Sequence, residues 1–258
     1  MANITLEFLG TGTSQGVPVI GCECAVCRSK DPRDKRLRTS GLVKVNGSTV
    51  LIDAGPDLRQ QMLRSKVTHL DAVLLTHEHM DHISGLDDLR AFNYRQRRAM
   101  DIHANAATLR AVERIYHYAF DEDRYPGVPE LRLHLIDKGS FRAADIEMEA
   151  VEVMHDRLPV LGFRIGGLAY ITDAKTMDPA QLERIKGVDT LVLNALRRKE
   201  HPSHLNLREA LEFVERVGPR RTFFTHISHL LELHAVMEGE LPAGVSLAYD
   251  GLLVEIPV

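Results

Sequence analysis

The chain has 258 residues and a formal net charge of −4, with 44% hydrophobic and 26% charged residues. This composition is ordinary for a soluble globular protein, and no apolar run approaches the roughly 18 residues that a membrane helix needs, so a membrane protein is excluded. The negative charge leaves no electrostatic footprint for broad nucleic-acid binding. The first residues show neither the basic nor the apolar region of a signal peptide, and we therefore expect a cytoplasmic location.

Strands and helices are predicted to follow one another along the whole chain. Residues 4–9 alternate like a strand, and the Asn46-Gly47 pair between 42–45 and 49–52 predicts a β-hairpin. Further strands are predicted at 72–75, 102–104, 131–136, 146–153, 161–165, 168–171, 190–193, 221–224, 245–249 and 252–256. Helices are predicted from residue 57 to about 64, and at 86–98, 105–119, 179–186 and 207–217. Strands with helices between them, and no linker, predict one domain over residues 1–258 of the α/β (α+β) class.

The run 76–82 has the sequence THEHMDH and follows a short apolar strand. His77 and His79 share one face if the strand continues, and Asp81 and His82 then lie in the turn that follows. Clustered imidazoles and carboxylates repel one another or stay solvated unless a cation holds them together. The pattern H-x-H-x-D-H therefore predicts a metal site.

Other side chains that can bind a metal occur where predicted strands give way to loops. His155, Asp173 and His226 each follow such a strand. Taken singly, each has an ordinary explanation, as a surface histidine or as an aspartate that forms a turn. Strand ends are where α/β enzymes place their sites, so their occurrence together with the histidine motif favours a metal centre.

In the order and spacing of these residues the chain resembles the metallo-β-lactamase superfamily of binuclear hydrolases. The resemblance covers essentially the whole chain and implies a four-layer αββα sandwich that holds two divalent cations, zinc or manganese, at one edge of its sheets. It implies one metal held by His77, His79 and His155. It implies a second metal held by Asp81, His82 and His226, with Asp173 as the bridge between the two. Asp53 would orient a ligand histidine without binding metal itself.

All three cysteines, Cys22, Cys24 and Cys27, lie within six residues. An odd number excludes a closed set of disulfides within one chain, and the spacing C-x-C-x-x-C instead suits a structural zinc, which needs a fourth ligand. Together with the loop 9–18, this cluster resembles the phosphoribosyl cyclic phosphodiesterase branch of the superfamily. That resemblance implies His229 as the fourth ligand, with His234 as the alternative.

The function implied is hydrolysis of a small, cyclic phosphodiester by a metal-bridging hydroxide. His204, or His201 as its alternate, would protonate the leaving oxygen or stabilise charge on phosphorus, and Asp81 is both a metal ligand and a candidate catalytic residue. The expected partner is this small-molecule substrate, with no membrane; nucleic acid is disfavoured, and a homodimer is left open.

Three alternatives remain at this stage. Processing of tRNA 3′ ends uses the same metal set, but the net negative charge and the lack of a long basic insertion argue against it. Hydrolysis of a thioester or a β-lactam is compatible with the fold, since a fold does not fix its substrate. A non-catalytic metal-binding protein would show a lost ligand, whereas every ligand position in this chain is filled.

Overall fold

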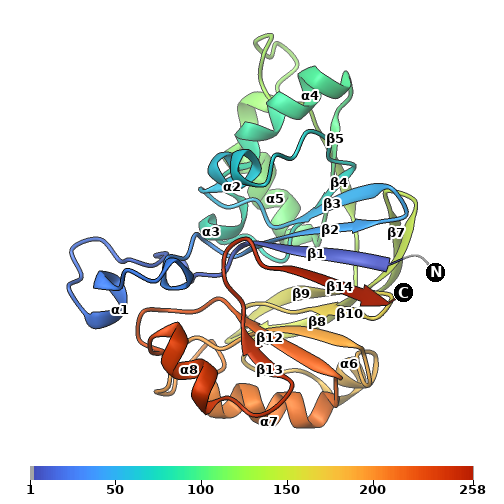
Figure 1. Ribbon diagram of the computed structural model, residues 1–258. Helices are drawn as coiled ribbons and strands as arrows, with labels where there is room; N and C mark the ends of the chain where they lie inside the picture. Colours follow the sequence, from blue (N-terminus) through green and yellow to red (C-terminus); the bar gives the residue numbers. More distant parts are fainter. Residues whose placement is uncertain (1–2, 258) are drawn as a thin grey trace.

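The structure is a computed structural model that describes residues 3–257. Two seven-stranded sheets pack face to face, and helices cover the outer face of each sheet (Figure 1). The first sheet has the order β14 (Leu253–Pro257), β1 (Asn3–Gly10), β2 (Ser40–Val45), β3 (Ser48–Ile52), β4 (Ala72–Leu74), β5 (Met100–Ala104) and β6 (Leu131–Leu135). The second has the order β13 (Val245–Leu247), β12 (Arg221–Thr225), β11 (Thr190–Asn194), β10 (Leu168–Tyr170), β9 (Leu158–Ile165), β8 (Ile146–His155) and β7 (Gly139–Ala143).

Helices form the two outer layers, so the predicted four-layer αββα sandwich is confirmed (Figure 1). On the first sheet lie α2 (Leu58–Arg64), α4 (Arg90–Gln96) and α5 (Ala106–Ile115), and on the second lie α6 (Pro179–Glu183), α7 (Leu207–Val217) and α8 (His234–Glu240). One-turn helices α1 (Ala25–Arg28) and α3 (Met80–Ile83) stand near the sheet edge, α1 on a loop that projects from the body of the molecule. Within residues 3–257, no helix is both long and apolar enough to cross a membrane.

Apolar side chains fill both faces of each central strand. In β4, Ala72 and Leu74 point into the core between the sheets, whereas Val73 points into the core beneath α2, α4 and α5. In β11, Val192 points inward and Leu191 points toward the layer of α7. Strands buried on both faces read as continuous apolar runs, which explains why these short segments were recognisable as strands.

Several predicted boundaries were wrong. The residues after β4 leave the sheet at Leu75, so His77 and His79 are not on a strand, and Asp81 and His82 lie in α3 instead of a turn. The helix predicted over 86–98 is a 3₁₀ turn followed by α4, which ends at Gln96 because Arg97 takes the left-handed conformation with φ 54°. Strand β7 and helices α1 and α8 were not predicted, since their short polar sequences carry no clear periodicity.

The topology brings several strand ends to one edge of the sandwich. Strands β10, β11 and β12 are parallel neighbours in the second sheet, and β3, β4 and β5 are parallel neighbours in the first. The two edges are joined by backbone hydrogen bonds, from Ile227 N to Thr11 O (2.9 Å) and from Thr13 N to Ile227 O (3.1 Å). Because parallel strands end at the same side of a sheet, the residues that follow them meet there.

Candidate metal centre

The segment that follows β4 turns its histidines inward. His77 and His82 are fully buried, and His79 is the residue that precedes the first turn of α3. The Nε2 atom of His77 lies 3.0 Å from Nδ1 of His79. Two imidazole nitrogens at this distance must share either a proton or a cation, so the local geometry is compatible with a cation between them.

The second sheet contributes the other predicted residues. His155 is the last residue of β8, Asp173 lies three residues beyond β10, and His226 follows β12 directly. The ligand atoms fall into groups in which all atoms lie within 4.8 Å of one another. These groups are His77, His79 and His155; His77, His82 and Asp173; Asp81, His82 and His226; and His155, Asp173 and His204.

The groups place all seven predicted metal ligands in one cluster. Asp173 shares a group with members of both predicted triads, which is the position that a bridging carboxylate requires. Glu78, although part of the same sequence motif, belongs to none of the groups. The assignment of individual metals to individual ligands stays a prediction.

Buried nitrogens in this cluster lack hydrogen-bond partners. They are Nε2 of His82, Nδ1 of His204 and both ring nitrogens of His226. Nε2 of His82 lies 3.2 Å from a carboxylate oxygen of Asp81 and 3.4 Å from one of Asp173. A buried polar atom without a partner costs about 1–3 kcal/mol, so four together are unusual in a folded protein. Divalent cations bound among these nitrogens and carboxylates would satisfy them, and the donor set therefore fits metal.

Residues behind the cluster fix the orientation of its imidazoles. Asp53 accepts a hydrogen bond from His82 Nδ1 at 2.7 Å and is held in turn by the backbone N–H (2.8 Å) and hydroxyl (2.9 Å) of Thr76. His155 donates from Nδ1 to the carbonyl of Ser203 at 2.8 Å. Such contacts select the tautomer that leaves the other ring nitrogen free to bind metal. The contribution of Ser203 has no signature in the sequence, because a main-chain carbonyl provides it.

Three residues of the site have a left-handed backbone. The φ angles are 62° at Asp53, 55° at Asp173 and 53° at His226. Residues other than glycine adopt this region uncommonly, although Asp and His are enriched among those that do. Backbone conformations of this kind cluster at functional sites, where the surrounding structure maintains them.

The electrostatics of the cluster keep its carboxylates ionised. Burial opposes the ionisation of Asp173, but His226 and His82 outweigh it and hold the pKa of this carboxyl well below its usual range. Burial, together with the neighbouring His82, lowers the pKa of His77. An ionised carboxylate and a neutral imidazole are the forms that bind metal, so Asp173 and His77 are held in the required state. Burial opposes the charged form of His82, but the carboxylates of Asp173, Asp53 and Asp81 outweigh it and raise the pKa of this ring, which therefore has to release a proton when metal binds.

His204 and His201 differ in their distance from the cluster. The His204 ring is buried, with its centroid 4.3 Å from that of His155 and 4.9 Å from that of His226. Its Nδ1 lies 3.6 Å from a carboxylate oxygen of Asp173, and burial, followed by His226, lowers its pKa to about 2. His201 lies behind His204, with its Nδ1 facing Ser203. Of the two candidates, His204 is the one that contacts the clustered residues.

The three cysteines converge on His229. Its Nδ1 lies 3.3 Å from Sγ of Cys22, 3.4 Å from that of Cys24 and 3.6 Å from that of Cys27. Zinc bonds of about 2.0–2.3 Å at tetrahedral angles place neighbouring ligand atoms about 3.5 Å apart, which these distances match. His234, the alternative fourth ligand, lies elsewhere, with its ring 3.1 Å from the guanidinium of buried Arg36.

The thiols of this cluster differ in acidity. Burial raises the pKa of Cys27 to about 11. At Cys24 the backbone N–H of Cys27 and the ring of His229 outweigh the effect of burial and lower the pKa to about 6. A thiolate is the form that binds metal, so the lowered pKa of Cys24 favours metal binding at this thiol.

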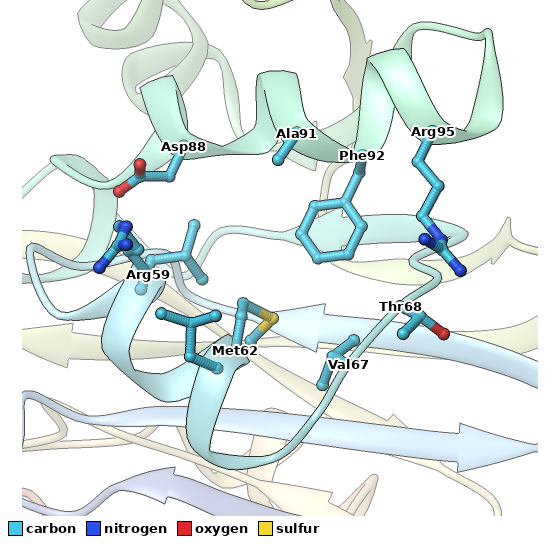
Figure 2. Close-up of a pocket in the computed structure, with 10 residues that line it drawn as sticks. Arg59, Met62, Val67, Thr68, Asp88, Ala91, Phe92 and Arg95 are labelled. Carbon is cyan, nitrogen blue, oxygen red and sulfur yellow. The ribbon is translucent and has the colours of Figure 1, made fainter.

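A separate cavity of about 390 Å³ lies between α2 and α4 on the outer side of the first sheet (Figure 2). Its centre is apolar, with Met62, Val67 and Phe92, and Arg59 and Arg95 stand toward its two ends. The residues that line it include none of the clustered histidines and aspartates. The cavity is therefore distinct from the candidate metal centre.

Comparison with known proteins shows the family. Residues 48–227 match the model of the β-lactamase superfamily domain. The chain is 43% identical over 248 residues to an octanoyltransferase of Porphyromonas gingivalis; the match takes in 95% of the chain but only 50% of that protein, so the chain spans about half of this relative's length. It is 30% identical to coenzyme PQQ synthesis protein B of Methylobacterium radiotolerans, over 96% of the chain and 99% of that relative.

Among solved structures, a diphosphatase from the PhnP family superposes with a TM-score of 0.93 at 39% identity. The superposition covers 99% of this chain and 98% of that one. The superposed part of the chain includes the projecting loop with α1. This loop lies outside residues 48–227, the segment that the family model matches. The chain therefore belongs to the metallo-β-lactamase superfamily of hydrolases.

Proposed function

We propose that the chain is a binuclear, metal-dependent phosphodiesterase that acts on a small, cyclic phosphodiester. The observation that carries this proposal is the cluster of seven residues with nitrogen or oxygen ligand atoms at one edge of the sandwich. The buried imidazole of His204 lies against this cluster. The similarity to a diphosphatase supports chemistry at phosphorus, since a diphosphate also presents a phosphorus with two substituted oxygens.

The ligands fall into two sets in this proposal. One metal would be held by His77, His79 and His155. The other would be held by Asp81, His82 and His226, and Asp173 would bind both. Zinc or manganese suits this mixture of imidazoles and carboxylates. A third metal, a structural zinc, would be held by Cys22, Cys24, Cys27 and His229.

Two divalent cations supply Lewis acidity: they acidify water at the site and offset the charge on phosphate oxygens. The residues of the chain do the rest. Asp53 and Thr76 keep the His82 ring in one tautomer, and the carbonyl of Ser203 does the same for His155. His204 donates a hydrogen bond to an oxygen of the reacting phosphate, because its ring stands against the ligands without belonging to either metal set. Its pKa of about 2 leaves the ring neutral in the free site, so transfer of a proton requires that the anionic phosphate first raise this pKa.

Hydrolysis of an acyl ester or thioester is the second candidate. The observation that favours it is the relative of Porphyromonas gingivalis, which is named for the transfer of an octanoyl group. The three thiols of this chain do not provide a nucleophile for such a transfer, because all three face His229. The two candidates therefore share the same metal centre and differ only in the group attacked.

An assay of the zinc- or manganese-loaded protein separates these candidates. The substrates are a five-membered cyclic ribose phosphate, bis(p-nitrophenyl) phosphate, a dinucleoside diphosphate, an octanoyl thioester, a β-lactam and a precursor tRNA. We expect turnover of the three small phosphate compounds, with the cyclic ribose phosphate hydrolysed fastest. Turnover of the thioester alone would exclude the phosphodiesterase, and a protein that binds both metals yet hydrolyses none of the six would be a non-catalytic metal binder.

Substitution of His204 tests its proposed role in catalysis. We expect His204→Ala to lower kcat on the cyclic diester by about 10²–10⁴-fold, the usual contribution of a positioned proton donor. The matched variant His201→Ala should lower kcat by less than about tenfold, since His201 faces Ser203 instead of the ligands. Steady-state kinetics with metal content measured on each variant provides the comparison. A larger loss in His201→Ala would assign the donor to His201.

A further inference from the structure

Asn194 is a buried polar residue that makes both of its side-chain hydrogen bonds to the backbone of one residue, Ala174. It is the last residue of β11 and has no exposed surface. Its Oδ1 accepts from the backbone N–H of Ala174 at 2.7 Å, and its Nδ2 donates to the carbonyl of Ala174 at 3.0 Å. The side chain thus reproduces the pair of hydrogen bonds that a neighbouring strand would make.

The carbonyl of Ala174 has a second donor. The backbone N–H of Leu205 donates to it at 2.9 Å. Ala174 follows Asp173 directly, and Leu205 follows His204 directly. The backbone of Ala174 therefore joins three segments: the chain that follows β10, the end of β11 and the loop before α7.

This junction matters because the backbone of Asp173 has left the sheet. Strand β10 ends at Tyr170, and Asp173 takes the left-handed conformation with φ 55°. We infer that Asn194 is a positioning residue, which fixes the backbone of Ala174 and through it both the carboxylate of Asp173 and the imidazole of His204. The inference rests on the proposed function, since it concerns how Asp173 as bridging ligand and His204 as donor are held in position relative to each other.

The chain contains a matched control for this inference. Asn93 of α4 is also buried, and it accepts from Glu130 N at 3.0 Å and donates to Glu130 O at 3.0 Å. Its hydrogen bonds to Glu130 are those of Asn194 to Ala174, but the backbone it holds leads into β6 and not into the metal centre. The amide of Asn93 also donates to the carbonyl of Arg98 at 3.0 Å, within the same part of the fold. We call such a pair of side-chain hydrogen bonds to the backbone of one residue a clamp. A change at Asn93 therefore reports how much stability is lost with a clamp that lies away from the metal centre.

The test compares Asn194→Asp with Asn93→Asp in the zinc-loaded protein. Each change keeps the acceptor, removes the donor and directs a carboxylate oxygen at a backbone carbonyl. We expect similar falls in the midpoint of thermal unfolding. Only Asn194→Asp should bind the catalytic metals about 10–100-fold more weakly in competition with a chelator, and only it should lower kcat with little change in KM.

Equal metal affinity in the two variants would overturn the inference. If Asn194→Asp does not fold, hydrogen exchange on the metal-free wild-type protein decides: slow exchange at the amides of Ala174 and Leu205 supports the clamp, and exchange as fast as that of an exposed loop refutes it. Wild-type protein that fails to bind two catalytic metals would instead contradict the proposed function, so the two failures are distinguishable.

Discussion

Asp173→Asn should abolish tight binding of the catalytic metal pair and lower kcat by about 10³-fold or more. The change removes a negative charge that faces Nε2 of His82 at 3.4 Å and Nε2 of His226 at 3.3 Å. Loss of metal-ion catalysis costs several kcal/mol of transition-state stabilisation, and each 1.36 kcal/mol corresponds to about tenfold in rate. Asparagine tolerates the left-handed backbone at this position, so the fold should survive.

Metal content by elemental analysis, chelator competition and steady-state kinetics measure this effect. Asp178→Asn is the control, because Asp178 only caps α6 through Ala180 N at 2.8 Å and asparagine caps a helix equally well. We expect the control to keep full metal content and activity. If Asp173→Asn retained two metals with unchanged affinity, Asp173 would not bridge them, and the assignment of ligands would need revision.

Cys24→Ser should remove the structural zinc and destabilise the protein by at least about 3 kcal/mol, since loss of a metal site is among the largest effects of a single substitution. The pKa of the Cys24 thiol is lowered to about 6, and its sulfur also caps α1 by accepting from Cys27 N. Serine can replace the cap but is a poor zinc ligand. The projecting loop packs only a small apolar core of its own, so little else holds it.

The readouts are zinc content and the free energy of unfolding, each measured at constant free zinc. Three metals per chain are expected in the wild type and two in Cys24→Ser, with the catalytic pair retained. Ser29→Ala, in the same loop, serves as the control, because Ser29 contacts Asp34 and not the thiols. A variant that folds normally and loses the catalytic pair instead would reverse the division between structural and catalytic sites.

Much of the site was predictable because its residues lie at strand ends. His77, His79, Asp81 and His82 lie within six residues after β4, Asp173 and His226 follow β10 and β12, and His155 is the last residue of β8. Parallel strands deliver their following residues to one edge, so a list of polar residues after apolar strands already approximates the cluster. The fold class follows from the same alternation of strands and helices.

What could not be predicted depends on contacts between distant backbone groups. The carbonyl of Ser203 binds His155 and the backbone of Ala174 binds Asn194. Because these partners are main-chain groups, no residue type in the sequence indicates them. The break after β4 was missed because the apolar run continues through Leu75, which is buried although it lies outside the strand. The resemblance already favoured His204 over His201, because Leu205, Asn206 and a helix follow His204, but only the path of the loop shows which ring lies against the clustered residues.

The metal centre takes its ligands from both halves of the sandwich. The segment after β4 belongs to the first sheet, and His155, Asp173 and His226 extend from the second. A cation bound there is a cross-link between two layers that otherwise meet mainly through apolar packing. Any opening of one sheet from the other would release it, so its binding free energy adds to the cohesion of the whole fold. A cation bound at this centre would thus serve both the proposed catalysis and the stability of the fold.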